Sequence, residues 1–345
     1  MSVGAFSSLA ESINAMGTTW KAAIPTRFSN MDQVKQLCGA WRPQDPEWPT
    51  DLVEDPRATD ELARLDKLVQ SQSLDIPDNY SVIEEYGAQC TVLGHVRDQA
   101  NCGSCWAFSA TEAFEGSKCI YDGLDIMYSA QDITGCCTGA ACGYSGGCVA
   151  GSANAAMSYI TVMHQGVVTG GDFNGTFDSG CKDYALSPCT HISGEETDEY
   201  PLCSHDEPTA TCVTECDADY GGPSYASDKT EGPKGATGYP LGVGGSADRV
   251  PNIQAALMEY GPLSATFTVY EDFVYYESGI YQHVDGEALG GHAILLTGWG
   301  TEDGVDYWTV KNSWNPTWGE DGFFRILRGT DEVGIEYTVY GMSFS

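Results

Sequence analysis

Apolar residues recur at helical spacing just after Gly103. Four of them lie at positions i, i+4, i+7 and i+8, namely Trp106, Ala110, Ala113 and Phe114. This spacing places them on one face of a helix, and the preceding Gly103-Ser104 is typical of a turn that leads into one. The pattern therefore predicts a buried helix that begins at about Cys105.

The hydrophobic pattern changes near residue 220. Beyond it, runs of β-branched and aromatic residues separated by Gly and Asp predict strands at 266–270, 292–299, 307–311 and 323–327. Residues 252–260 precede Gly261-Pro262 and predict a single helix among the strands. The second half of the chain is therefore expected to be mostly a sheet or a barrel.

Residues 1 to about 75 differ from the rest in composition. They contain one cysteine, Cys38, and a Pro-rich acidic passage at 43–56. Three apolar residues of this region lie at helical spacing, namely Leu62, Leu65 and Val69. Two interpretations stay open at this point, a separable pro-segment or an ordinary helical cap at the N-terminus.

The middle region, residues 76–220, holds most of the cysteines. The chain has 14, and setting Cys38 and Cys105 aside leaves 12, an even number that six disulfides would use completely. Residues 181–216 are polar, acidic and interrupted by prolines, which predicts a surface loop stapled by disulfides. Helical spacing at 150–163 predicts a second helix in this region.

The net charge and the cysteine content limit which partners and which cell compartment the chain is expected to have. The 345-residue chain has 16 Lys and Arg against 49 Asp and Glu, a net charge of −33, which disfavours nucleic acid and anionic membrane surfaces. No apolar run reaches the ~20 residues of a membrane span. The high cysteine content is ordinary for a lysosomal, vacuolar or secreted protein. Because residues 1–10 lack a signal-peptide pattern, we expect that a targeting segment precedes this sequence.

Cys105 is the first candidate for chemistry. At a helix N-terminus, the positive end of the helix dipole favours the thiolate over the thiol, and the thiolate is the nucleophile. In a chain so rich in cysteine, the alternative is that Cys105 is one more half of a disulfide. A basic partner elsewhere in the chain would favour the first interpretation.

His292 is the candidate partner among the six histidines. Gly290-Gly291 allows close backbone approach in front of it. A hairpin about the turn 301–304, centred near 302–303, would place opposite it a residue within one of Asn312. The Asn312 amide would accept from one ring N–H and direct the other nitrogen to the thiol. The alternative is a histidine with a structural role at the mouth of a hairpin.

Gln99 and Trp314 complete the candidate site. The side-chain amide of Gln99 and the backbone N–H of Cys105 would form an oxyanion hole for acyl transfer. Trp314, two residues after Asn312, would cover the His–Asn contact and exclude water. Taken alone, each residue has a plainer interpretation, a surface glutamine and a core tryptophan.

Three blocks around these residues resemble papain-type cysteine peptidases and, within them, the cathepsin B group. They read Gln99-Ala100-Asn101-Cys102-Gly103-Ser104-Cys105-Trp106-Ala107-Phe108, Gly291-His292-Ala293 and Lys311-Asn312-Ser313-Trp314-Asn315-Pro316-Thr317-Trp318-Gly319. Further likenesses are Thr18-Thr19-Trp20-Lys21-Ala22 and Leu37-Cys38-Gly39 to the group's short propeptide, Cys136-Cys137 to its double cysteine, and Tyr281-Gln282-His283-Val284 to its second lobe. The likeness runs from about residue 12 to the end.

The resemblance implies an α+β, papain-like fold with two lobes. Residues 1–75 would be the propeptide. A mainly helical left lobe would span 76–220 and carry an occluding-type loop at 181–216, and a β-barrel right lobe would span 221–345. The implied disulfides use all 12 spare cysteines: Cys90–Cys119, Cys102–Cys148, Cys136–Cys212, Cys137–Cys142, Cys181–Cys216 and Cys189–Cys203.

The implied function is that of a cathepsin B-like cysteine endopeptidase, made as a zymogen. Peptide bonds would be hydrolysed by a Cys105–His292–Asn312 thiolate–imidazolium mechanism with Gln99 at the oxyanion, and no metal or other cofactor is needed. Partners would be protein and peptide substrates, the chain's own propeptide as inhibitor, and cystatin-type inhibitors. Two alternatives stay open, a non-catalytic papain-fold binding protein and a Cys-His acyl transferase of the transglutaminase kind.

The chain departs from the family where specificity is set. In cathepsin B, two adjacent histidines of the occluding loop hold the loop to the body and grip a substrate's C-terminal carboxylate. Here only His191 remains, which could pair with Asp98, and Ile192 stands where the gripping imidazole would be. We therefore expect weak or absent dipeptidyl carboxypeptidase activity, unless His205 substitutes.

Substrate-binding residues implied by the resemblance are Gly103, Gly151, Gly291, Trp314 and Thr338. The family's Cys-Asn-Gly-Gly run appears here as Cys148-Val149-Ala150-Gly151, so main-chain docking of substrate could be altered. Thr338 takes the place of an acidic residue in the pocket for the residue upstream of the cleaved one. Preference there should shift toward apolar side chains.

Overall fold

Helix α5 (Cys105–Asp122) lies at the centre of the structure. The computed structural model describes residues 3–25, 27–42, 45, 56–161, 163, 165–192, 196–203, 210–232, 238–240 and 249–342. α5 begins at Cys105, as predicted, and ends at Gly123, whose left-handed φ of 69° stops the helix. Every residue from 105 to 119 is buried, as expected of a helix covered on all sides.

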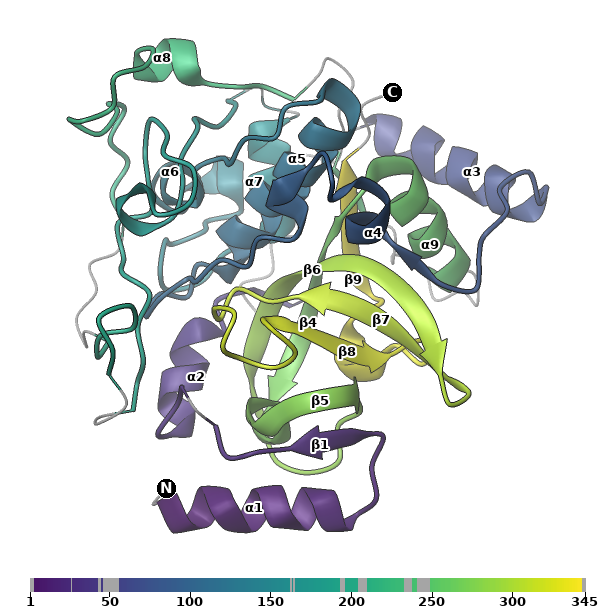
Figure 1. Ribbon diagram of the computed structural model, residues 1–345. Coiled ribbons are helices and arrows are strands. Elements are labelled where there is room, and N and C mark those ends of the chain that lie inside the picture. The colour runs from purple at the N-terminus through teal and green to yellow at the C-terminus, as the bar shows by residue number, and fades with distance from the viewer. Residues whose placement is uncertain are drawn as a thin grey trace.

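A sheet of nine strands among the described residues covers one side of α5 and occupies the centre and right of Figure 1. The strand order is β1 (Trp20–Ala22), β5 (Tyr276–Tyr281), β8 (Phe323–Leu327), β7 (Val305–Lys311), β6 (Ala288–Glu302), β4 (Leu263–Tyr270), β9 (Thr338–Met342) and β3 (Gly238–Pro240), and β2 (Tyr80–Ser81) pairs with β6. The pairs are antiparallel except for β5 with β8. All four predicted strands are present, and β4 and β6 are longer than predicted.

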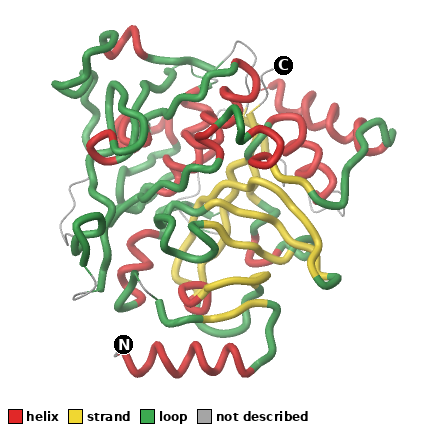
Figure 2. Tube along the Cα trace, viewed as in Figure 1, coloured by secondary structure: helices red, strands yellow, loops and turns green. Residues whose placement is uncertain are grey.

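The other side of α5 is covered by helices and loops. α6 (Ala130–Cys136) and α7 (Ala153–Ile160) contact α5, and the single turn α8 (Tyr225–Asp228) lies further out, whereas the short helix α4 (Val82–Tyr86) lies against strands β2 and β6. α7 is shorter than the predicted 150–163 because the Ser152 hydroxyl caps its N-terminus by accepting from the Ala155 N–H. Figure 2 shows these helices apart from the strands, an α+β arrangement.

The N-terminal segment, residues 1–75, contacts both halves through its described part. This part contains α1 (Val3–Ala15), β1, α2 (Met31–Leu37) and α3 (Pro56–Gln70). β1 extends the sheet beside β5, and α3 lies against α9 (Arg249–Tyr260) at the upper right of Figure 1. Arg64 of α3 donates to a Glu259 carboxylate oxygen at 3.1 Å and to the Tyr260 hydroxyl at 2.9 Å. The helix predicted from Leu62, Leu65 and Val69 is therefore α3.

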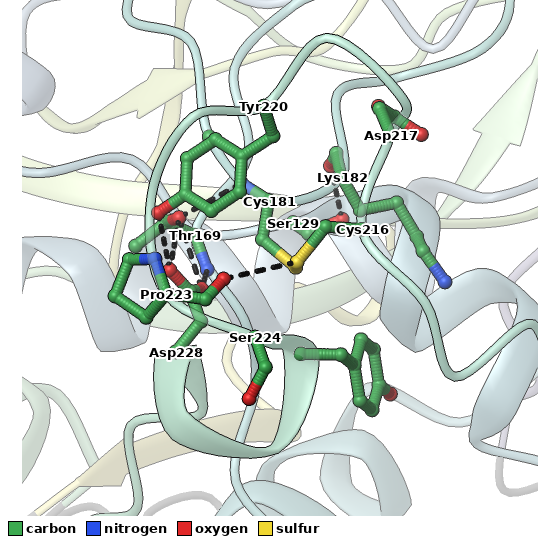
Figure 3. The surroundings of a disulfide bond; sticks show 12 residues. Ser129, Thr169, Cys181, Lys182, Cys216, Asp217, Tyr220, Pro223, Ser224 and Asp228 are labelled. Carbon is green, nitrogen blue, oxygen red and sulfur yellow. Dashed lines mark hydrogen bonds between the residues drawn. A yellow bond between two sulfur atoms is a disulfide. The ribbon is translucent and has the colours of Figure 1, made fainter.

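Six disulfides connect the helical half. They are Cys90–Cys119, Cys102–Cys148, Cys136–Cys212, Cys137–Cys142, Cys181–Cys216 and Cys189–Cys203, the pairing that the resemblance implied. Three of them fix the polar loop 181–216: two lie within it, and Cys136–Cys212 joins it to the end of α6. Figure 3 shows how its base is fixed: Asp228 accepts from the hydroxyls of Tyr220 (2.6 Å) and Thr169 (3.0 Å) beside the Cys181–Cys216 bond.

Candidate active site

Cys105 is the first residue of α5 and is fully buried. It and Cys38 are the two cysteines outside disulfides in the described chain, so the interpretation of Cys105 as half of a disulfide is wrong. The backbone N–H of Ala293 hydrogen-bonds to the Cys105 sulfur. Because Ala293 directly follows His292 on β6, the helix of the cysteine and the strand of the histidine meet at this sulfur.

His292 is oriented by Asn312 and covered by Trp314. The Nε2 atom of His292 lies 2.8 Å from Oδ1 of Asn312, so Nε2 donates to the amide oxygen. The ring of Trp314 lies 4.8 Å from the imidazole, centroid to centroid, and all three side chains are buried. Nδ1 of His292 has no close side-chain partner among the described residues, and the backbone of Leu37 in the N-terminal segment interacts with the ring and raises its pKa.

The predicted hairpin geometry was off by about one residue. The turn is centred between Asp303 and Gly304, because Glu302 pairs with Val305, and a bulge between Leu296 and Gly298 then shifts the pairing. The ladder ends at the pair of Leu295 with Lys311. Asn312 therefore reaches His292 from the segment beyond the strand. Extrapolated past the bulge, the register would place Trp314 opposite the histidine.

Both ends of the Gln99 side-chain amide are engaged, near the turn that leads into α5. Its Nε2 donates to the carbonyl oxygens of Cys102 (2.7 Å) and Leu37 (3.0 Å). Its Oε1 accepts from the hydroxyl of Ser313 at 2.7 Å, a contact that the sequence argument missed. Leu37 belongs to the N-terminal segment, so the donor expected to stabilise an oxyanion already binds a peptide carbonyl.

Beyond Leu37, the last residue of α2, residues 38–41 cross the site, and Gly39 and Ala40 form β-bridges with Gly291 and Gly151. Ala40 donates to the Gly291 carbonyl at 3.0 Å, and Gly151 exchanges hydrogen bonds with Gly39 (2.8 Å) and Trp41 (3.0 Å). A Cβ on Gly39 would lie 1.8 Å from the carbonyl oxygen of Gly103, so only glycine fits there. The predicted binding residues Gly103, Gly151 and Gly291 are thus all in contact with this segment.

Burial controls the charge of both reactive groups. It raises the pKa of the Cys105 thiol to about 11, although hydrogen bonds from the backbone of Ala293 and Gly39 lower it. It lowers the pKa of His292 to about 4, against the raising effect of the Asn312 hydrogen bond. In the full-length chain burial therefore disfavours the thiolate that the helix N-terminus was expected to favour, and the thiolate–imidazolium pair stays a prediction for the processed enzyme.

Asp98 was expected to pair with His191, but its partner is Arg27. Its Oδ1 lies 2.5 Å from Nη2 of Arg27, and both side chains are buried. The backbone N–H of His191 donates to the carbonyl of Arg27 at 2.8 Å, and its imidazole lies 3.1 Å from the Cys203 sulfur. The N-terminal segment thus places a permanent cation where the loop histidine was expected. His205 lies outside the described residues.

Thr338 lines a cavity of about 410 Å³ that opens beside the site. Its wall includes Phe267, which pairs with His292 across β4 and β6, and Tyr337 and Val333. Arg42 of the N-terminal segment also lines the cavity and donates to the Thr268 hydroxyl at 3.4 Å. The cavity is therefore next to the imidazole and is lined by apolar and hydroxyl groups together with the charged side chains of Arg42 and Asp331.

Ser313 and Arg27 are among the contact residues that sequence reasoning did not single out; Ala40, Arg42 and Phe267 are others. Ser313 lies inside the block that carries Asn312 and Trp314, so its neighbours were a signal. Arg27 offered none, because its partner Asp98 is 71 residues away.

In the described part of the chain, no group of three or more His, Cys, Asp or Glu side chains could hold a metal ion. No helix among these residues is long and apolar enough to cross a membrane.

Solved proenzymes share this fold. The structure matches that of "proCathepsin B S9 from Trypanosoma congolense" with a TM-score of 0.74 and 26% sequence identity, over 97% of each chain. It also matches a digestive procathepsin L 3 of Tenebrio molitor with a TM-score of 0.62 and 19% identity, over 99% of this chain and 90% of that one. The α+β, papain-like architecture is thereby confirmed.

The chain belongs to the papain family of cysteine proteases, whose family model matches residues 81–342. Cathepsin B-like cysteine proteinase 6 of Caenorhabditis elegans is 44% identical over 78% of this chain and 66% of its own length, so the match spans just under two thirds of that relative. Cathepsin B-like cysteine proteinase 4 of the same organism is 38% identical over 96% of this chain and 90% of its own. The expected family and enzyme class, a cysteine-type peptidase, are confirmed.

The state of Cys105 can be tested by alkylation of the full-length chain. Because its pKa is raised to about 11, labelling by iodoacetamide should be slow at pH 6 to 8 and rise steeply only as the pH approaches that value. Peptide mass spectrometry separates Cys105 from Cys38. Rapid labelling of Cys105 at pH 6 in the uncleaved chain would contradict the burial argument.

Proposed function

We propose that this chain is the precursor of a cathepsin B-like endopeptidase that works through Cys105, His292, Asn312 and Gln99. The observation that carries the proposal is their convergence beneath residues 37–41. A free cysteine at a helix N-terminus meets the strand of an asparagine-oriented imidazole, and a glutamine amide beside it already binds a peptide carbonyl.

The reaction starts when the segment over the site has left. The thiol proton of Cys105 passes to Nδ1 of His292, and the sulfur attacks the carbonyl carbon of the scissile bond. Nε2 of Gln99 and the Cys105 N–H donate to the oxyanion. The imidazolium then gives its proton to the leaving amine, and a water deprotonated by the imidazole hydrolyses the thioester. Asn312 keeps Nδ1 facing the sulfur throughout.

The N-terminal segment acts as the chain's own inhibitor in this proposal. Its carbonyl at Leu37 occupies the oxyanion donor, and its extended part pairs with Gly151 and Gly291, where a substrate would dock. Residues 76–220 and 221–345 are then the left and right lobes of the processed enzyme, with the occluding-type loop at 181–216.

Acid favours release of this inhibitor. With the segment in place, His292 has a pKa of about 4, below its usual 6.5, so docking requires a neutral imidazole. When the segment leaves, the imidazole regains water or a thiolate partner and its pKa rises. Docking of the segment is therefore fully stable only above the pKa that His292 has once the segment has left. As the pH falls from that value to about 4, docking loses roughly 3 kcal/mol of stability.

The specificity follows from the occluding-type loop. Removing a cationic donor from a carboxylate clamp removes about 1.5 to 3 kcal/mol, and Ile192 cannot replace it. The enzyme is then mainly an endopeptidase, with weak or absent dipeptidyl carboxypeptidase activity. In the cavity lined by Thr338 and Phe267, apolar substrate side chains are preferred.

The partners and compartment follow from the same proposal. Substrates are proteins and peptides, and cystatin-type inhibitors fit the emptied cleft. Acid-triggered release suits a lysosome, a vacuole or an acidic secretion. The charge of −33 supports the absence of nucleic acid partners.

The activity is tested with matched peptides that carry free or amidated C-termini. The processed enzyme should cleave both at similar rates, and Cys105→Ala should abolish cleavage of both. Ile192→His should raise dipeptide release from the free-carboxylate peptide by roughly tenfold or more. Dipeptide release by the unaltered enzyme at a rate far above internal cleavage would refute the endopeptidase assignment.

Arg27 should stabilise the inhibited state. Its buried pair with Asp98 is lost in Arg27→Met, and we expect conversion to the processed form at pH 4.5 to quicken by roughly tenfold or more. Arg64→Met, which removes a more exposed pair with Glu259, is the control and should change the rate by less than about threefold. Equal rates for Arg27→Met and the unaltered chain would rule out this role.

A further inference from the structure

Lys311 is a buried cation at the point where the proposed catalytic segments meet. It is the last residue of β7, directly before Asn312, and its side chain is 1% exposed. Its Nζ lies 2.9 Å from Oε2 of Glu112 and donates to the carbonyl oxygens of Val92 (3.3 Å) and His95 (3.0 Å). An ammonium has three N–H donors, so each has an acceptor.

Glu112 connects Lys311 to the helix of the nucleophile. It lies seven residues after Cys105 on α5, and therefore two turns further on the same face. Its side chain is 4% exposed. Because α5 belongs to the helical half and β7 to the sheet, this ion pair crosses the boundary on which the site is built.

The two carbonyl groups connect Lys311 to the segment of the oxyanion donor. Val92 lies in the short 3-10 helix Thr91–Leu93, and His95 lies four residues before Gln99. The amide of Gln99 in turn accepts from the hydroxyl of Ser313, two residues after Lys311. Two connections thus join the segment of Gln99 to the segment of Lys311: the Lys311 ammonium binds Val92 and His95, and Ser313 binds Gln99.

We propose that Lys311 is a positioning residue for the peptidase reaction. By joining α5, the segment before Gln99 and the end of β7, its ammonium keeps Asn312 and His292 aligned with the Cys105 sulfur. Lys311 touches neither substrate nor the reacting atoms, and it acts through Asn312. The inference rests on the proposed function, because it assumes that Cys105 and His292 carry the reaction.

Stability alone does not account for this cation. A buried ion pair is often replaced by apolar side chains of similar volume without loss of stability, whereas removal of one partner leaves a buried charge unpaired. Three hydrogen bonds from one atom, however, restrict the relative position of three segments. A misplacement of about 1 Å between reacting groups can cost roughly 100-fold in rate.

The difference between a structural and a positioning role is tested with single and double variants of the processed enzyme. Lys311→Met strands the Glu112 carboxylate, and Lys311→Met/Glu112→Met replaces the pair by apolar side chains. Glu112→Gln keeps a hydrogen-bond acceptor for Lys311 but removes the negative charge. It replaces Lys311→Met as the test of this ion pair if Lys311→Met does not fold. The control is Arg328→Met, which removes a largely buried cation that follows β8 and pairs with the half-exposed Asp306 of β7, away from the site. The readouts are Tm, kcat, KM and the rate of Cys105 alkylation by iodoacetamide at pH 6 and pH 10.

We expect Lys311→Met and the double variant to lose roughly 100-fold in kcat with KM changed by less than about threefold, and Glu112→Gln to lose about tenfold. The double variant should regain the Tm of the unaltered enzyme without regaining kcat. Alkylation at pH 6, which needs the thiolate–imidazolium pair, should slow in parallel with kcat, while alkylation at pH 10 should not change. Arg328→Met should lower Tm alone.

Recovery of kcat together with Tm in the double variant would overturn the proposal, as would an unchanged kcat in Lys311→Met or Glu112→Gln. Failure of the proposed function gives a different result. In that case the unaltered enzyme itself would neither hydrolyse peptides nor show rapid alkylation of Cys105 at pH 6.

Discussion

The docking of residues 37–41 into the groove between helix α5 and strand β6 is the interaction on which the state of the site depends. It excludes water from Cys105 and His292, and burial then favours the neutral form of each group. The same segment supplies the carbonyl that Gln99 binds. The N-terminal segment therefore engages the amide of Gln99 at a site where burial favours the neutral forms of Cys105 and His292.

Cations are scarce in this acidic chain, and several are buried at its internal boundaries. Arg27 joins the N-terminal segment to Asp98, Arg97 pairs with Glu115 on α5, and Lys311 pairs with Glu112 on the same helix. Since buried ion pairs contribute little to the net free energy of folding, we infer that their role in this chain is to fix the positions of the segments that they join. These ion pairs fix where the N-terminal segment, helix α5 and the sheet lie relative to one another.

Much of the fold could be predicted from local patterns. The start of α5, the helix at α3 and the four strands follow from periodicity, and family likeness gave the disulfide pairing. The hairpin register was missed because the turn is formed by Asp303 and Gly304, both with positive φ, and not centred near 302–303. The bulge after Leu296 partly offsets this error. The partner of Asp98 could not be predicted, because Arg27 reaches it from a distant segment. The charge of Cys105 was misjudged because a helix dipole is visible in sequence, whereas burial by another segment is not.

The central claim is that the N-terminal segment keeps the Cys105–His292 pair neutral by burying it. The most direct test is an NMR titration of the His292 imidazole in the full-length chain and in the processed enzyme. The account predicts a pKa of about 4 in the full-length chain and a value above the usual 6.5 once the segment has been removed. The same pKa in both forms would contradict it.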